Sequence, residues 1–172
     1  EFIRTLVELE KFDQAFKFSQ SVWNNDELIF EADLLLGLNY FIKKDYINAE
    51  KHFERLNTIS RSNLFFSNFV GNVLIAWSRA NQGFEVESYK FLEKIPRPYR
   101  QLKKTQKVFL QCYFEDVQTM KSLEELINDE EYEFIRYNFF LTNYLLFNNQ
   151  IKKAKQVIKN AAEKHNSNLL VK

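Results

Sequence analysis

A spaced run of small and large apolar residues over residues 36–56 restricts this stretch to a pair of closely packed helices. The run reads Leu36-Gly37-x2-Tyr40-x4-Asp45-Tyr46-x2-Ala49-x3-Phe53-x2-Leu56. Gly37 and Ala49 are small enough for two helices to approach each other, and the larger residues fill the space around them. The polar segment 43–45 has the length of a tight connection between two helices. The pattern therefore predicts a helical hairpin.

Composition extends this prediction to the whole chain. Only 3 glycines and 2 prolines occur among 172 residues, too few for the many turns of a β-sandwich or β-barrel. Hydrophobic residues make up 45% of the chain and aromatic residues 16%, enough apolar surface to exclude a disordered protein. The length suits one domain, and a single cysteine rules out an internal disulfide. We expect an all-α fold.

The run over residues 36–56 resembles the signature of the tetratricopeptide repeat (TPR) family. That signature is L-G-x2-Y followed by Y-x2-A-x3-F-x2-A, and Leu56 takes the place of its last alanine. The resemblance implies a right-handed α–α superhelix, a TPR-like solenoid of about four and a half helix pairs. A closed helical bundle is the alternative architecture, but a bundle does not need small residues at a regular period.

The same template, moved along the chain, aligns five residues with the central alanine of the signature: Ala15, Ala49, Ser88, Met120 and Ala154. Their spacings are 34, 39, 32 and 34 residues, close to the period of about 34 in TPR arrays. In the last copy, Ile151, Ile158 and Ala161 match the packing positions Tyr46, Phe53 and Leu56. We therefore expect one domain over residues 1–172, with repeats at approximately 1–25, 28–60, 63–95, 98–128 and 132–166.

The resemblance also implies where a ligand binds, because the first helix of each TPR lines the concave surface of the array. The corresponding groove positions in this chain are Leu38, Phe41, Trp77, Phe109, Asn143 and Leu146. They are apolar and aromatic in the middle repeats, which favours an amphipathic helix or an extended apolar segment as ligand. The carboxylate clamp of chaperone-adaptor TPR domains is not expected, since Leu34 and Leu38 occupy its positions in the second repeat. In the alternative interpretation these side chains pack against one another.

A basic stripe offers a second interpretation. Arg100, Lys103, Lys104 and Lys107 recur at helical spacing on one face of a helix. Such a stripe could bind phosphates of a nucleic acid or an acidic partner. Against this, the net charge of the chain is only +1 and no aromatic residue interleaves on that face. Solvated lysines on a helix are the ordinary alternative.

Residues that could perform catalysis are few and scattered. His52 and His165 belong to distant repeats, with His52 expected on the repeat surface beside Phe53, and Cys112 has no histidine near it in sequence. No phosphate-binding, dinucleotide-binding or zinc-protease motif occurs. The acidic run Glu124, Glu125, Asp129, Glu130, Glu131 and Glu133 lacks the spacing of a calcium loop and is expected to form a solvated helix end. We expect neither an enzyme nor a metal or cofactor site.

These observations favour a non-catalytic protein–protein interaction or scaffold module that binds a peptide or helix in its groove. The alternatives are a nucleic-acid or acidic-partner adaptor that uses the basic helix, and the recognition module of a larger enzyme. No window of about 18 uninterrupted apolar residues predicts a membrane span, and we expect a cytoplasmic location. The chain begins without Met, so we expect a fragment of a longer, bacterial protein. Its exposed ends are expected to self-associate through Phe2, Leu6, Leu169, Leu170 and Val171.

Overall fold

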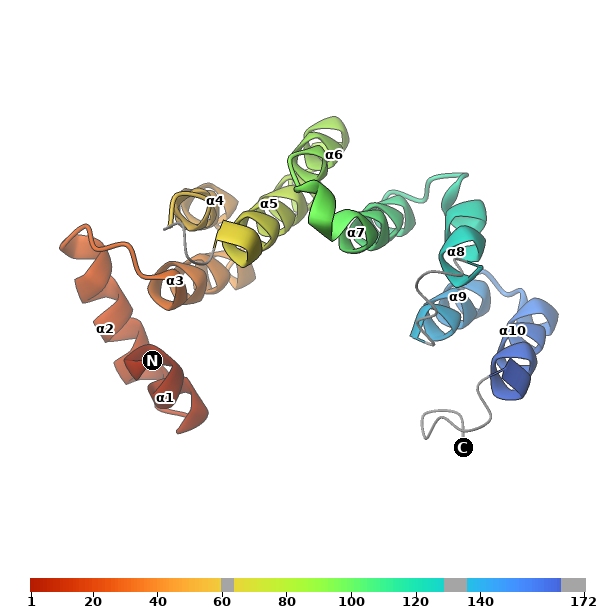
Figure 1. Cartoon of the computed structure of the whole chain (residues 1–172), viewed down its shortest axis with the longest axis horizontal. Helices are drawn as coiled ribbons and strands as arrows, with labels where there is room; N and C mark the ends of the chain where they lie inside the picture. Colours follow the sequence, from red (N-terminus) through yellow and green to blue (C-terminus); the bar gives the residue numbers. More distant parts are fainter. Residues whose placement is uncertain (60–63, 129–135, 165–172) are drawn as a thin grey trace. The chain divides into compact units, whose positions relative to one another are not determined.

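The computed structural model describes residues 1–59, 64–128 and 136–164. Within these ranges the chain forms ten α-helices and one short 3-10 helix, with no strand (Figure 1). The expected all-α class is confirmed. The chain divides within helix α7 into two compact units, residues 1–106 and 107–172.

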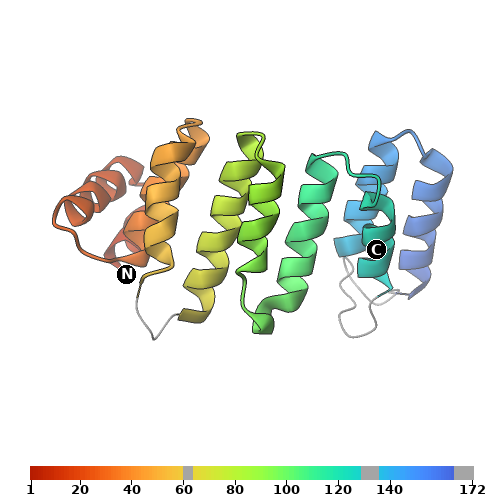
Figure 2. The same ribbon diagram turned by 90° about the horizontal axis from the view of Figure 1, so that it is seen from above.

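Unit 1 contains six helices that pack in chain order, each against the next. Their bounds are α1 Phe2–Glu8, α2 Phe12–Asn24, α3 Phe30–Ile42, α4 Tyr46–Leu56, α5 Leu64–Asn81 and α6 Glu85–Glu93. The 3-10 helix η1, Arg97–Tyr99, and the first half of α7, Arg100–Tyr113, complete this unit. Figure 2 shows the orange helix α4 beside the yellow-green α5, with α6 on the other side of α5. The core between these helices contains Ala49, Phe53, Leu56, Ile59 and Ile75.

Unit 2 contains the second half of α7 together with α8 Thr119–Ile127, α9 Arg136–Phe147 and α10 Ile151–Lys164. Helix α9 packs against both α8 and α10. The core of this unit is formed by Val108, Leu123, Leu126, Tyr137, Leu141, Leu145 and Ala154. Unit 2 therefore has a hydrophobic core of its own.

The tight turns that follow six of the helices share one geometry. In each, a residue with positive φ donates its N–H to the carbonyl three residues earlier, and the next N–H donates to the carbonyl five residues before it. These residues are Glu10, Asp26, Lys44, Gly83, Glu115 and Asn149. Such bonds satisfy carbonyls left open at a helix end. The five turns that join α1 to α2, α3 to α4, α5 to α6, α7 to α8 and α9 to α10 lie 34, 39, 32 and 34 residues apart.

Only one of these six turns uses glycine, although a residue with a side chain is strained at positive φ. Lys44, exposed and at φ 63°, is an example. We expect Lys44→Gly to raise the free energy of unfolding by about 0.5–1 kcal/mol, because the relief of strain exceeds the added entropy of the unfolded chain. Lys43→Gly is the matched control, since φ is −77° there, and it should lower stability. Urea denaturation of both variants tests this; equal losses would contradict the strain argument.

The close approach predicted at Gly37 and Ala49 is present. Ala49 is fully buried, and a Cβ built on Gly37 would collide with Cε1 of the Phe53 ring and lie 2.7 Å from its Cδ1. Burial extends to other small residues of the predicted register, with Ala15 and Ser88 at 0% exposure and Ala154 at 2%. Met120, the large residue in that series, packs against the edge of the core of unit 2. Small side chains thus lie where helices meet.

Two expectations about the chain ends differ in outcome. Leu6 was expected to be exposed and to mediate self-association. It is instead buried between α1 and its neighbours, because α2 and α3 both pack on α1. Phe2 is 58% exposed, although its ring contacts the ring of Phe18 at 4.9 Å. Residues Leu169, Leu170 and Val171 lie outside the described residues.

Candidate functional site

The three groove residues predicted in unit 1 are partly buried. Leu38 and Phe41 lie on α3 and pack against the same core as Phe53, with the rings of Phe41 and Phe53 at 6.4 Å. Trp77 lies on α5, and its indole N–H donates to Oε1 of Gln106 on α7 at 2.9 Å. The structure therefore brings Leu38 and Phe41 together and engages Trp77 in a contact between helices.

The three groove residues predicted in unit 2 differ in exposure. Phe109 on α7 is partly buried and meets the ring of Phe140 on α9 edge to face, with centroids 4.9 Å apart. Asn143 is exposed, and Leu146 is 46% exposed near the end of α9. Leu146 lines a groove between α9 and α10.

The basic stripe begins at the start of α7, where Arg100, Lys103 and Lys104 belong to unit 1 and Lys107 begins unit 2. Lys103 is paired with the carboxylate of Glu93 on α6 at 2.5 Å, and only 25% of its side chain is exposed. Lys104 is half-buried. The Lys103 ammonium is thus already neutralised by an acid of the same unit, which weakens the stripe as a site for phosphates.

The expected surface position of His52 is wrong. His52 is 4% exposed, and its Nδ1 lies 3.0 Å from Oδ1 of Asp33 on α3. Its ring stacks on Tyr40 with an interplanar angle of 12°, and the Trp23 ring lies 4.2 Å away. The reason is that α4 is covered on more than one side: the His52 ring packs between α2 and α3, whereas Phe53 belongs to the core that α4 shares with α3 and α5.

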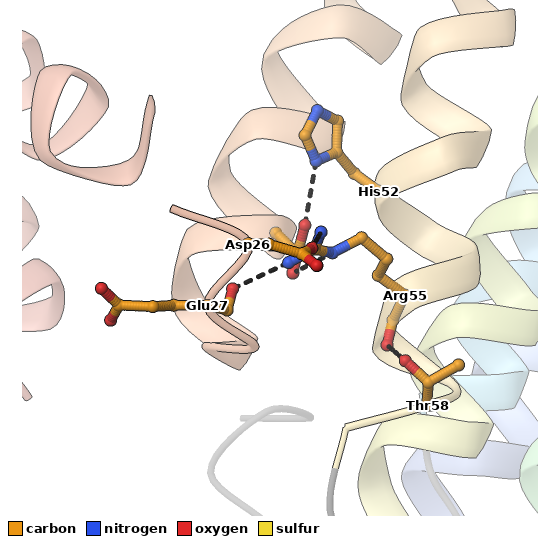
Figure 3. A network of polar contacts seen from close by, with 6 residues as sticks. Asp26, Glu27, His52, Arg55 and Thr58 are labelled. Carbon is orange, nitrogen blue, oxygen red and sulfur yellow. Dashed lines mark hydrogen bonds and ion pairs between the residues drawn. The ribbon is translucent and has the colours of Figure 1, made fainter. Parts of the chain in front are cut away.

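Arg55 extends this contact into a network of polar groups (Figure 3). Its Nε donates to Oδ2 of Asp33 at 3.3 Å, Nη1 to Oδ1 of Asp26 at 2.8 Å and Nη2 to the carbonyl of Glu27 at 2.7 Å. The guanidinium also lies over the ring of Trp23, 4.4 Å from its centroid. One side chain of α4 therefore holds α3, the end of α2 and the turn between them.

A small cavity of about 280 Å³ adjoins the network and is lined by Gln20, Trp23, Asn24, Leu36, Tyr40 and His52. The Asp33 carboxylate orients the imidazole, as it would in a catalytic pair. None of the lining residues is a serine, cysteine, lysine or acid that could act as a nucleophile with it. We therefore interpret the network as a structural connection that fixes α2, α3 and α4 relative to one another.

Burial also affects two titratable groups outside this network, Glu50 and Cys112. Burial raises the pKa of the Glu50 carboxyl, and this effect outweighs the opposing attraction of Arg79, which pairs with it at 2.5 Å. Burial also raises the pKa of the Cys112 thiol, so the reactive thiolate is disfavoured. Nowhere in the described residues do three His, Cys, Asp or Glu side chains gather as a metal site would require. His165, Asp129, Glu130, Glu131 and Glu133 lie outside those residues.

A groove lined mainly by apolar side chains lies between α9 and α10, and we call it the α9–α10 groove. It has a volume of about 370 Å³ and is lined by Leu146, Ile151, Ala154 and Ile158 together with Thr142, Lys155 and Lys159. Ile151 is 53% exposed and Ile158 36% exposed. Ile158 was expected in the core, as the match of Phe53, and this expectation is wrong. Phe53 is covered by α5, whereas no described helix follows α10.

Of the residues that line the α9–α10 groove, the sequence predicted only Leu146 as a groove residue. A signal was nevertheless present in the distribution of charge. Residues 136–164 contain six basic residues and one acid, Glu163, a net charge of +5 in a chain of net charge +1. Summing charge for each helix pair rather than for the whole chain would have identified this hairpin as the basic part of the molecule.

None of the helices in the described part of the chain has the length and apolar character needed to cross a bilayer. Comparison of the chain with protein-family models, with curated proteins and with solved structures finds no match.

Proposed function

We propose that this chain is a TPR-like helical-repeat module that binds protein partners and does not itself catalyse a reaction. The observation that supports the proposal most is the α9–α10 groove. Leu146, Ile151 and Ile158 line it and stay between 36% and 53% exposed, and Phe147 next to Leu146 is 85% exposed. Grouped apolar side chains at a concave surface are typical of sites that bind helices or peptides.

The repeated turns support the TPR-like part of the proposal. The residues aligned with the central alanine of the template, four of them small and the fifth Met120, recur at spacings of 34, 39, 32 and 34 residues, and the turns inside the helix pairs recur at the same spacings. The two series rest on different features, since one depends on side-chain size and the other on backbone geometry. In helical-repeat proteins each hairpin packs on the next and the accumulated surface binds ligands.

Selection of peptides from a displayed random library tests the proposed function without knowledge of the natural partner. The 172-residue chain is the bait, and enriched peptides are then measured against the variant Ile151→Asn with Ile158→Gln. Loss of apolar anchors should weaken binding by at least about tenfold, since a buried anchor typically contributes ~2 kcal/mol. Both substitutions are neutral, so the net charge stays unchanged.

The matched control is Ile42→Asn with Ile47→Gln, which removes apolar surface of the same kind from unit 1, where Ile42 is 78% and Ile47 70% exposed. Peptide affinity should survive in this control. Thermal melting of both variants separates loss of binding from loss of folding. Equal affinity for the groove variant and the wild type, or no enriched peptide at all, would refute a binding role for the groove.

A further inference from the structure

We propose that the α9–α10 groove binds an acidic amphipathic helix. This inference rests on the proposed function and goes beyond it, because it specifies the chemistry of the partner. Three observations carry it: the face of α10 that borders the groove, the charge around that face, and the helix that covers the corresponding face of α4 in unit 1.

The groove-lining face of α10 alternates apolar and basic residues. Ile151, Lys155, Ile158 and Lys159 are spaced by four, three and one residues, so they share one side of the helix. Ala154 and Ala161 are buried, with exposures of 2% and 5%. A ligand in the groove would therefore meet isoleucines along its middle and ammonium groups along one edge.

The charged side chains that line the groove are basic. Lys155 and Lys159 are both exposed, and the only acid between residues 136 and 164 is Glu163. Its carboxylate lies 3.9 Å from the Lys159 ammonium, with about 70% of both side chains exposed, so water can readily replace this contact. For Lys155 the structure shows no ion pair within the described residues. Acidic residues on a partner would complement this edge.

The spacing of the two lysines fits a helical partner. Lys155 and Lys159 are one helical turn apart, about 6 Å along α10. Acidic residues at positions i and i+4 of a second helix are separated by the same distance, so both pairs could form together. Apolar residues beside these acids on the same helix would face Ile151 and Ile158.

Unit 1 shows how such a face is covered. There α5 packs against α4, and Phe53, the match of Ile158 in the repeat register, is fully buried in the core that α4 shares with α3 and α5. On α10 the described residues supply no equivalent helix. An anionic membrane suits the groove less well, because α10 buries Ala154 and Ala161 and leaves no continuous apolar face to insert.

Fluorescence anisotropy with designed peptides tests this inference. The probe is a labelled peptide of about 18 residues with leucines at i, i+3, i+4 and i+7 and glutamates elsewhere. Its matched peptide has glutamine in place of every glutamate. We expect the acidic peptide to bind at least about tenfold more tightly than the glutamine peptide, and this preference should shrink as salt is added.

Protein variants separate the charged edge from the apolar floor. Lys155→Glu with Lys159→Glu should weaken binding of the acidic peptide at least about tenfold. Lys17→Glu with Lys90→Glu is the matched control, because it changes the net charge equally at exposed positions of α2 and α6 and should leave affinity nearly unchanged. The neutral variant Ile151→Asn with Ile158→Gln should weaken both peptides alike. Circular dichroism melting confirms that each variant is folded.

The outcomes distinguish this inference from the proposed function. If both peptides bind equally and the isoleucine variant binds neither, the proposal of an acidic partner is overturned, but the groove still binds proteins. Binding to phosphatidylserine vesicles but to neither peptide would overturn both. A third outcome is self-association in sedimentation that the isoleucine variant abolishes and that blocks peptide binding. The groove would then bind a second copy of this chain, and the proposal of an acidic helix would be overturned. Equal weakening by the Lys17–Lys90 control would show that only net charge matters and would also overturn it.

Discussion

Replacing Asp33 by alanine should lower the free energy of unfolding by about 3–5 kcal/mol, because it removes the buried carboxylate that pairs with both His52 and Arg55. The carboxylate is 2% exposed and accepts from both His52 and Arg55. Without the Asp33 carboxylate, Arg55 keeps its exposed partner Asp26 but loses its buried partner. The Arg55 side chain is only 18% exposed. Chemical denaturation with a linear extrapolation measures the loss.

Asp26 provides the control within the same network. It pairs with the same arginine at 2.8 Å, closer than the 3.3 Å contact of Asp33, yet its side chain is 90% exposed. Solvent screens such a pair, so Asp26→Ala should cost about 0–1 kcal/mol. If both alanine variants lose the same stability, burial does not determine the strength of this network and our structural interpretation of it is wrong.

The contrast between these two aspartates also shows what the sequence could not reveal. Helical periodicity predicts which residues share a face, and it correctly predicted helices around Gly37 and Ala49. It cannot predict that Asp33 and His52, 19 positions apart, meet in the interior, because both residue types are usually exposed. A polar pair is buried only when two helices satisfy each other's groups, and that depends on how the helices cross.

The groove residues show a second limit of the sequence reasoning. Matching Ile158 to Phe53 predicted a core residue, since the two occupy the same position in the register. Burial, however, depends on the helix that covers a position, and α5 covers Phe53. Leu146 was predicted as a groove residue on its position in the first helix of a pair, but the floor and edge of the groove come from the second helix, α10. Register alone does not distinguish a covered face from an open one.

The packing of Gly37 against Phe53 leads to the second large effect. Phe53 is fully buried, and Phe53→Ala should lower the free energy of unfolding by about 3–5 kcal/mol through lost burial and the cavity left behind. Gly37→Ala should cost about 1–3 kcal/mol, because its Cβ would collide with the same ring, offset in part by the better helix propensity of alanine. Because the Phe53 ring is the obstacle to the new Cβ, the double variant should lose less stability than the two single variants together, by about 1–2 kcal/mol.

Gly71 is the matched control for this coupling. A Cβ there would lie 2.9 Å from the backbone carbonyl of Phe53 and 2.5 Å from Oδ1 of Asn57, so it also contacts residue 53 but not the ring. Removing the ring cannot relieve a collision with the backbone, and Gly71→Ala combined with Phe53→Ala should therefore be additive within about 0.5 kcal/mol. Denaturation midpoints of the single and double variants provide both cycles. Equal coupling energies in the two cycles would mean that the structure around residue 53 relaxes in the same way in both double variants. The contact between Gly37 and the Phe53 ring would then not explain the coupling.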